Sequence, residues 1–378
     1  MDRIIERAYF MDGLKDGLKI GFIGFGLIGG SIAKALRASL PDVRIIVYDV
    51  NKATLEQALR EGVANQAVRS IDISFSGCNY IFLCAPVSIN DENLITLKQF
   101  LSPSCTLTDV GSVKGGIHQH IEALGLSAQF IGGHPMAGSE RFGYPNSKAR
   151  LLENAYYILT PSKETSAEKL EGYRNLVAAM GAIPLVLDAA QHDFVTAAIS
   201  HLPHIIASSL VNLVKESDSP DGTMKMVAAG GFKDITRIAS SSPDMWQQIC
   251  LTNTDNIVRL LENYIQSLSS LKETLSARDA SSIYRFFDGA RVYRDSFIGT
   301  SSGPIKKSFS ITVDIADETG ALATVATILA RQHISIKNIG IVHNRELAEG
   351  ALRIEFYEEN AIKTAADLLK SRGYTVFL

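Results

Sequence analysis

A glycine-rich motif near the start of the chain has the spacing of a dinucleotide-binding turn. Its six residues, GFGLIG at 24–29, follow an apolar run and precede a helical pattern, and this strand–turn–helix context makes the spacing informative. The phosphates of a dinucleotide would lie at the N-terminus of that helix, where free N–H groups favour negative charge. The predicted binding residues are Gly24, Gly26, Leu27, Ile28 and Gly29.

An acidic residue, Asp49, ends the next predicted strand, twenty residues after Gly29. Its carboxylate can accept hydrogen bonds from ribose hydroxyls and would repel a 2′-phosphate. The motif therefore predicts NAD as the cofactor in preference to NADP, although Lys52 lies close by and weakens the preference.

Two later strand ends should complete the cofactor pocket, because open α/β sheets bind ligands beyond the carboxyl ends of their strands. One is DVGSVK at 109–114. The other is CAP, formed by Cys84, Ala85 and Pro86. We interpret Cys84 as a small buried apolar residue and not as a nucleophile.

Three histidines are candidates for acid–base chemistry or ligand binding. The motif GGHPMAG places His134 between glycines and a proline, on a predicted loop at the same edge of the sheet. Taken alone, a loop histidine is more often a turn or surface residue. His201 and His204 share one helix face at i, i+3, a spacing that also suits metal ligands. No glutamate or cysteine is placed to complete such a set, so no metal site is predicted.

The elements that must position these residues fall into three predicted domains. Residues 18–188 alternate short β-rich runs with helical patterns, which is typical of a Rossmann-type parallel sheet covered by helices. Residues 189–297 contain long helical patterns and no convincing strand. Residues 298–307 are rich in glycine, serine and proline and are interpreted as a linker. Residues 308–378 have the order βαββαβ, which predicts a ferredoxin-like domain.

Composition excludes several classes of protein. With 378 residues the chain can form two or three domains, and 37 Lys+Arg against 40 Asp+Glu leave no basic surface suited to nucleic acid. The apolar stretch 195–214 contains histidines, a proline and an asparagine, so we predict a buried helix there and no membrane span. Four scattered cysteines and a charged N-terminus without an apolar signal segment predict a reduced, cytoplasmic protein. A small molecule is the expected partner.

Several motifs, in order along the chain, resemble those of prephenate dehydrogenases. These are GFGLIGGS, DVGSVK, GGHPMAGSE, SHLPH and GGFKDITRIASSSPDMW, and the resemblance covers residues 19–297. It implies NAD-dependent oxidative decarboxylation of prephenate to 4-hydroxyphenylpyruvate in tyrosine biosynthesis. It also implies that the helical domain forms a homodimer.

The resemblance also implies roles for individual residues. His134 would be the base that takes the proton of the C4 hydroxyl, and Ser112 would orient that imidazole or the hydroxyl. Arg237 would grip a substrate carboxylate, where a guanidinium can form two parallel hydrogen bonds. The other expected substrate-site residues are His204 as a donor, His201 as a supporting or core residue, Trp246 beside the substrate or in the core, and Glu140 with Lys233 as a polar gate.

The last 70 residues resemble an ACT regulatory domain, which many prephenate dehydrogenases carry. The turn DETGAL at 317–322 corresponds to the effector-binding turn of that domain, although Thr319 stands where a proline is common. The resemblance implies an amino-acid effector, with tyrosine expected, bound where two such domains pair. The expected effector residues are Asp317, Gly320, Ala321, Leu322 and Asn338.

Other functions remain open from the sequence. An arogenate dehydrogenase, or a cyclohexadienyl dehydrogenase that accepts both substrates, would differ in few residues. β-Hydroxyacid dehydrogenases share the domain order but use a catalytic lysine in the helical domain, and GGHPMAG with SHLPH argues against them. A non-catalytic sensor of amino acids and NAD is the alternative outside enzymes.

Overall fold

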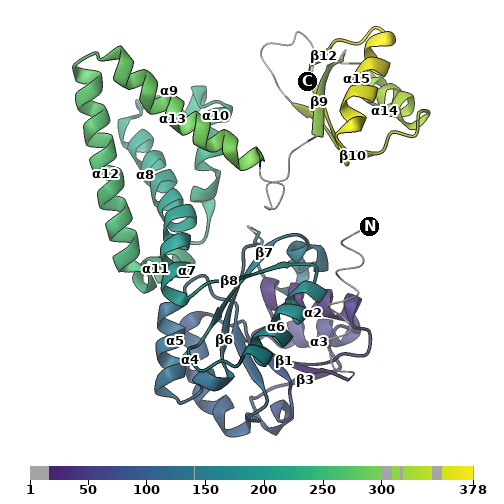
Figure 1. Cartoon of the computed structure of the whole chain (residues 1–378), viewed down its shortest axis with the longest axis vertical. Helices are drawn as coiled ribbons and strands as arrows, with labels where there is room; N and C mark the ends of the chain where they lie inside the picture. The colour runs from purple at the N-terminus through teal and green to yellow at the C-terminus, as the bar shows by residue number, and fades with distance from the viewer. Residues whose placement is uncertain (1–16, 140, 300–308, 316–317, 343–350, 378) are drawn as a thin grey trace. The chain divides into compact units, whose positions relative to one another are not determined.

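The chain forms two compact units in this computed structural model, one ending at Arg278 and one beginning at Asp279. The structure describes residues 17–139, 141–299, 309–315, 318–342 and 351–377 (Figure 1). Most of the predicted linker at 298–307 lies outside these residues. The helix at 280–299, which the sequence assigned to the helical domain, belongs to the second unit, so the predicted boundary at 297 stays a prediction.

A five-stranded parallel sheet forms the centre of the first unit. Its strands lie in the order β3-β2-β1-β4-β5, which is the order of a Rossmann-type sheet. The strands β1 and β4 are almost entirely buried, which suits a parallel sheet covered on both faces. The bounds are β1 Lys19–Ile23, β2 Arg44–Tyr48, β3 Gln66–Val68, β4 Tyr80–Leu83 and β5 Thr106–Asp109.

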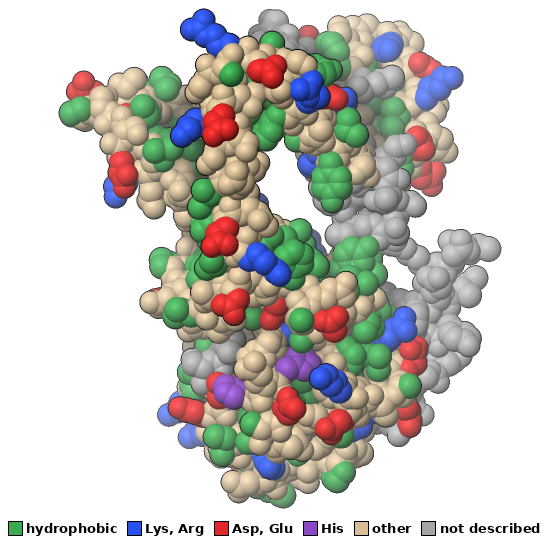
Figure 2. Space-filling model, turned by 60° about the vertical axis from the view of Figure 1, so that its left-hand side comes forward, with side chains coloured by type: hydrophobic (Ala, Val, Ile, Leu, Met, Phe, Trp, Pro, Cys, Tyr) green, Lys and Arg blue, Asp and Glu red, His purple; other side chains and the backbone are tan. Residues whose placement is uncertain are grey.

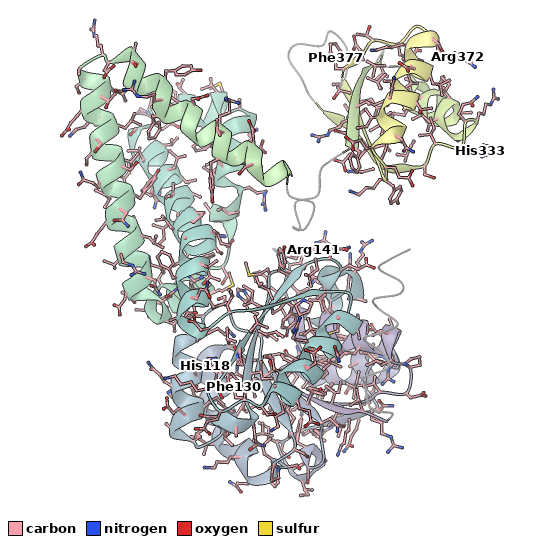
Figure 3. All side chains as sticks on the ribbon, in the orientation of Figure 1. His118, Phe130, Arg141, His333, Arg372 and Phe377 are labelled. Carbon is pink, nitrogen blue, oxygen red and sulfur yellow. The ribbon has the colours of Figure 1, made fainter. Side chains whose placement is uncertain are left out.

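Helices cover both faces of this sheet. Successive side chains of β1 point to opposite faces of the sheet and enter two different cores. Phe22 packs with α2, α3 and α6, whereas Ile23 packs with α4 and α5. The two groups of helices lie on opposite sides of the sheet in Figure 1, and their side chains fill the space between the layers in Figure 3. The bounds are α2 Leu27–Ser39, α3 Lys52–Arg60, α4 Val87–Leu97, α5 Gly115–Ala123 and α6 Ala167–Ala179.

A second, three-stranded sheet continues the first unit and corrects one prediction. The strands β6 Ile131–Pro135 and β7 Tyr156–Pro161 are antiparallel, and β7 is parallel to β8 Ile183–Val186. The sequence predicted parallel strands throughout. In its described residues, the segment between β6 and β7 contains only the short 3₁₀ turns η4 Tyr144–Asn146 and η5 Ala149–Leu152. Without a crossover helix there, the chain turns back on itself. His134 lies in β6, paired with Ile158, and not on a loop as predicted.

From Ala189 onward, the elements of the first unit are helical. Residues Ala189–Ser217 form one continuous helical stretch of α7 Ala189–Thr196, the π-helical turn η6 Ala197–His201 and α8 Leu202–Ser217. The remaining elements are α9 Thr223–Val227, α10 Gly230–Thr236, η7 Arg237–Ser240, α11 Pro243–Thr252 and α12 Thr254–Ser276.

The helical stretch Ala189–Ser217 is long and apolar enough to cross a membrane by length and composition, which is weak evidence. Only 22% of its most apolar window is buried, so the prediction of a buried helix was wrong for the single chain. Among its large apolar residues, Ile199 and Leu213 are exposed. Figure 2 shows apolar side chains at the surface. Positive and negative side chains are mixed among them on this face, and neither sign forms a large patch.

The second unit contains a four-stranded antiparallel sheet. After α13 Ala280–Gly299, the order β9, α14, β10, β11, α15, β12 is the βαββαβ order read from the sequence, and the strands lie in the order β10-β11-β9-β12. Apolar residues of both helices, including Leu329 and Leu369, pack on the sheet around Val313. The bounds are β9 Phe309–Asp314, α14 Ala321–Ala330, β10 Ile336–Val342, β11 Ala351–Phe356, α15 Asn360–Ser371 and β12 Val376–Phe377.

Candidate active site

The turn between β1 and α2 requires a glycine at each of three positions for a different physical reason. Gly24 has φ +86°, and a Cβ atom there would lie 2.5 Å from the backbone nitrogen of Ala85. A Cβ atom on Gly29 would lie 2.9 Å from the Gly24 carbonyl oxygen, so the third glycine allows close helix packing. A Cβ atom on Gly26 would meet nothing within 4 Å. Gly26 therefore leaves open the space through which a phosphate would approach.

The N-terminus of α2 is suited to an anion. Its N-cap residue is Gly26, which offers no side-chain hydrogen bond to the free N–H groups, and the first turn, which includes Leu27 and Ile28, contains no acidic residue. At the end of β2, Asp49 Oδ2 accepts a hydrogen bond from Phe25 N at 2.6 Å, and its Oδ1 accepts one from Asn51 N at 2.8 Å. Each carboxylate oxygen retains a further lone pair for a ribose hydroxyl. These residues fit a bound dinucleotide.

The predicted CAP segment lies against this turn. Cys84 N donates a hydrogen bond to Ile23 O at 2.7 Å, and the Cys84 side chain lies beside the position of Gly29. Burial raises the pKa of the Cys84 thiol, as does the charge of Asp109, so the thiol stays protonated and is a poor nucleophile. Ala85 closes the far side of the turn, and Pro86 is the N-cap residue of α4.

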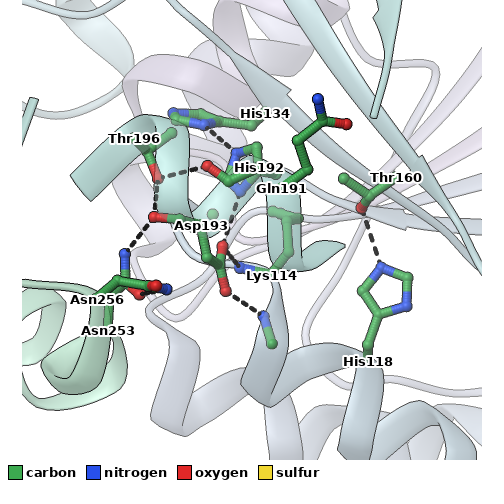
Figure 4. A network of polar contacts seen from close by, with 12 residues as sticks. Lys114, His118, His134, Thr160, Gln191, His192, Asp193, Thr196, Asn253 and Asn256 are labelled. Carbon is green, nitrogen blue, oxygen red and sulfur yellow. Dashed lines mark hydrogen bonds and ion pairs between the residues drawn. The ribbon is translucent and has the colours of Figure 1, made fainter. Parts of the chain in front are cut away.

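His134 is half-buried at the end of β6 and is bonded to a second histidine (Figure 4). Its Nδ1 atom lies 2.8 Å from Nε2 of His192, a fully buried residue of α7. The Nδ1 atom of His192 lies 2.8 Å from Oδ1 of Asp193. The three side chains form a chain of hydrogen bonds that ends at the imidazole of His134.

Asp193 fixes the direction of these hydrogen bonds because it is held as a carboxylate. Burial alone would raise its pKa, but hydrogen bonds from His192 and from the backbone N–H groups of Lys114 and Gly115 outweigh burial, and the pKa of Asp193 lies below its ordinary value. A carboxylate only accepts, so His192 Nδ1 donates to it. When only Nδ1 of His192 carries a proton, its Nε2 lone pair accepts from His134 Nδ1–H. His134 Nε2 is left with a free lone pair.

The environment keeps His134 neutral. Burial lowers its pKa well below the ordinary value of 6.5, and the nearby charges of Lys114, His192 and His201 lower it further. A neutral imidazole with a free Nε2 lone pair at neutral pH has the properties that a general base needs.

An internal ion pair holds the strand that carries His134. Lys114 is fully buried, and its Nζ atom donates to Asp109 Oδ2 and, at 2.7 Å, to Gly133 O. The Oδ1 atom of Asp109 accepts from Gly133 N at 3.2 Å. The sequence predicted the DVGSVK segment as part of the cofactor pocket, but these two side chains bond to each other in the interior. Their effect is to fix β6 beside β5.

His201 and His204 lie against the same tryptophan, which is consistent with their i, i+3 spacing on one helix face. The rings of His204 and Trp246 are stacked with centroids 3.8 Å apart, and the ring of His201 meets Trp246 edge-on at 6.0 Å. Asn253 Nδ2 donates to Asp193 O at 2.8 Å and lies 3.2 Å from His201 Nδ1. Burial lowers the pKa of His201 to about 4. The buried Trp246 Nε1 has no hydrogen-bond partner among the residues that the structure describes.

Electrostatic contacts link the predicted residues into one cluster. A positive charge on His201 would lower the pKa of His134, and one on His204 would lower the pKa of His201, while the charge of Arg237 lowers the pKa of His204. His134, His201, His204 and Arg237 are therefore near enough to influence one another in this order.

Two other predicted residues, Ser112 and Lys233, have no described contact with this cluster. Ser112 is half-exposed, and the hydrogen bond that orients His134 comes from His192 instead. Lys233 is exposed on α10. Glu140 lies outside the described residues. The roles of all three stay predictions.

Sequence reasoning missed His192 and Asp193. A signal existed, because a histidine and an aspartate follow one another in the first turns of the helix that begins at the predicted domain boundary near Asp188. Polar residues there can reach back to the sheet domain. Their burial and their bonding to His134 became visible only in three dimensions.

The dinucleotide turn, the acidic end of β2 and a neutral histidine on β6 are together the features of an NAD-dependent dehydrogenase. Two family models match the chain: "Prephenate dehydrogenase, nucleotide-binding domain" over residues 32–185 and "Prephenate dehydrogenase, dimerization domain" over residues 188–289. The chain belongs to the prephenate dehydrogenase family.

Individual relatives agree with this assignment. The chain is 36% identical to the prephenate dehydrogenase of Bacillus subtilis (strain 168), over 96% of this chain and 98% of that protein. A solved structure of prephenate dehydrogenase from Aquifex aeolicus, in complex with hydroxyphenyl propionate and NAD+, is 33% identical with a TM-score of 0.70, and the match covers 74% of this chain and 98% of that one. An arogenate dehydrogenase from Synechocystis is 29% identical with a TM-score of 0.68, over 74% and 100% of the two chains.

Proposed function

We propose that this enzyme oxidatively decarboxylates prephenate to 4-hydroxyphenylpyruvate, with His134 as the base. The observation that carries the proposal is the chain of hydrogen bonds from Asp193 through His192 to His134, because it leaves a lone pair on His134 Nε2. Bound NAD supplies the hydride acceptor. The family and the dinucleotide turn support prephenate and NAD as the reactants.

The proposed reaction balances without any further reactant. His134 Nε2 takes the proton of the C4 hydroxyl as the hydride at C4 departs, and a carbonyl forms at C4. The C–C bond to the ring carboxylate then breaks, carbon dioxide leaves, and its electron pair completes the aromatic ring. The phenol oxygen takes the proton back from His134. Aromatisation drives the second step, so no second base is required.

The remaining residues would bind the substrate. Arg237 would hold a carboxylate of the prephenate dianion, and His204 would donate a hydrogen bond. The buried Nε1 of Trp246 lacks a described partner and supports a position for Trp246 beside the substrate. Ser112 would orient the C4 hydroxyl, and Lys233 with Glu140 would line the pocket mouth.

The test of the base is His134→Asn. We expect turnover to fall by about 10²-fold or more, the scale of a lost acid–base group, with little change in the affinity for prephenate or NAD. NADH absorbance measures the first quantity and calorimetry the second. Turnover close to that of the wild type would remove His134 from the mechanism.

Arogenate is the second candidate substrate, and the likeness to the Synechocystis arogenate dehydrogenase favours testing it. Arogenate has an amine in place of the side-chain keto group, far from the C4 centre on which His134 acts. Comparing kcat/KM for the two substrates decides between prephenate, arogenate and dual specificity.

For the second unit, we propose an ACT-like regulatory role with tyrosine as the effector. The βαββαβ order supports it, as does Gly320, which has φ +96° and begins α14. Ala321, Leu322 and Asn338 would take part in binding, and the predicted Asp317 lies outside the described residues. Calorimetric titration with tyrosine and phenylalanine tests the proposal, and a lack of heat with both would leave the unit a structural role.

We further propose a cytoplasmic homodimer that assembles through the helical part of the first unit. Large apolar residues lie exposed there on α8 and α12, including Leu213, Ile265 and Leu268. The family model for residues 188–289 carries the description of a dimerization domain. Light scattering coupled to gel filtration measures the mass, and a monomer at micromolar concentration would contradict the proposal.

A further inference from the structure

A pocket of about 500 Å³ opens beside Leu27, the first residue of α2. Three cationic residues, Arg141, Lys148 and Arg150, line it. We refer to the cavity that these three side chains line as the cationic pocket. Figure 3 shows Arg141 among the side chains of the first unit. The pocket adjoins the uncapped helix N-terminus at which the phosphates of a dinucleotide are expected, so its charge bears on cofactor binding.

The segment that carries two of these cations is fixed to the dinucleotide turn. Tyr144 is fully buried, and its ring stacks on Phe25 of the turn with centroids 5.0 Å apart. Its hydroxyl donates to Glu61 at 2.7 Å. The backbone N–H of Lys148 donates to Ser31 Oγ, within α2, at 3.0 Å. The segment that carries Lys148 and Arg150 is therefore fixed against α2 and is not an independent loop.

The cationic pocket lacks negative charge of its own among the described residues. Its described lining contains no aspartate or glutamate. Within the described part of the chain, no ion pair involves Arg141, Lys148 or Arg150. Three like charges around one pocket repel one another, and an anion bound between them would relieve this repulsion.

We propose that Arg141, Lys148 and Arg150 bind the diphosphate bridge of NAD, extending the phosphate site from the N-terminus of α2 to the segment between β6 and β7. The inference rests on the NAD-dependent function proposed above. The diphosphate carries two negative charges, and guanidinium groups match phosphate oxygens with two parallel hydrogen bonds. Lys148 adds a mobile point charge.

The experiment compares ligands with and without phosphates on the full chain. Calorimetry measures the Kd of NAD, ADP and adenosine for the wild type and for the double variant Lys148→Gln/Arg150→Gln. We expect about a tenfold higher Kd for NAD and for ADP, corresponding to about 1.4 kcal/mol, and an unchanged Kd for adenosine. The salt dependence of NAD binding should also become shallower, because fewer protein charges meet the phosphates.

Arg44→Gln is the matched control, because Arg44 is an exposed cation at the opposite end of β2. Its Kd values should equal those of the wild type, and melting temperatures check that every variant is folded. Unchanged Kd values for NAD and ADP in the double variant would overturn the proposal. The proposal would also be overturned if the double variant lost as much affinity for adenosine as for NAD. A rise only in its KM for prephenate would overturn it too, and would assign the pocket to substrate carboxylates. Calorimetry measures NAD binding without turnover. If the enzyme did not act on prephenate, the proposed function would fail, but this test of NAD binding would still be valid.

Discussion

The Nδ1 atom of His134 on β6 lies 2.8 Å from the Nε2 atom of His192 on α7. This hydrogen bond joins the sheet part of the first unit to its helical part. Asp193 strengthens the junction, because its carboxylate also accepts the backbone N–H groups at the start of α5. The orientation of His134 is therefore set by residues of a different layer.

Replacing His192 by phenylalanine should slow the reaction without unfolding the protein. The ring fills the buried space but offers no acceptor to His134 Nδ1–H, so we expect kcat to fall by about 10²-fold while KM for NAD stays unchanged. His192→Gln, whose side-chain oxygen can accept this hydrogen bond, should restore part of the rate. His118→Phe is the control, because His118 contacts Thr160 and lies outside the chain of hydrogen bonds. A His192→Phe enzyme with normal kcat would rule out the positioning role.

The pH profile of kcat/KM should reflect the low pKa of His134. Protonation removes the lone pair that accepts the substrate proton, so activity is lost as the pH falls through this pKa. Because burial holds the pKa of His134 well below 6.5, activity should persist below pH 6.5 before it declines. Steady-state rates from pH 5 upward measure the acid limb. An acid limb centred at or above 6.5 would contradict the neutral environment described for His134.

Alanine substitutions should separate the roles of two glycines. Gly24→Ala forces a side chain into a left-handed conformation and against Ala85, so both stability and NAD affinity should fall. Gly26→Ala meets no protein atom and should leave the melting temperature nearly unchanged while it weakens NAD binding. Thermal melts with and without NAD measure both effects. Equal NAD affinity of the Gly26→Ala variant and the wild type would exclude close approach of the phosphates.

Much of the first unit could be predicted from its sequence, because local patterns determine it. The apolar strands predicted the sheet, and the glycine turn with Asp49 predicted the edge of the sheet at which the cofactor binds. The direction of β7 was missed because the chain between β6 and β7 folds into short 3₁₀ turns that leave no clear periodicity. His192 and Asp193 were missed because their function depends on contacts with residues 58 and 79 positions away in the chain. Neither spacing nor composition encodes such contacts.

Arginine should be specifically required at position 237. Arg237→Gln removes the charge, and we expect a higher KM for prephenate with a smaller effect on kcat. Arg237→Lys should recover only part of the affinity, because an ammonium group cannot form the two parallel hydrogen bonds of a guanidinium. Steady-state kinetics at saturating NAD measure both variants. An unaltered KM in Arg237→Gln would place the residue outside the substrate site.

His201 should make stability depend on pH. In the folded protein its pKa is about 4, whereas in the unfolded chain it is near 6.5. As the pH falls from about 6.5 to about 4, the unfolded state gains a proton that the folded state does not, so the free energy of unfolding falls. The melting temperature of the wild type should drop more steeply over this window than that of His201→Gln. If the melting temperatures of the two proteins fell equally with pH, His201 would have the same pKa in the folded and unfolded states.

The π-helical turn at Ala197–His201 sets a limit on how the chain can change in length. Such a turn contains one residue more than a regular helical turn, and it lies just before Pro203, which has no N–H to donate. Deleting a single alanine from it would restore regular winding but rotate everything downstream by about 100° relative to α7. Either Asn253 would then leave the backbone oxygen of Asp193, or Asp193 would leave the start of α5. The surplus residue thus keeps two separate sets of contacts in phase along one helix.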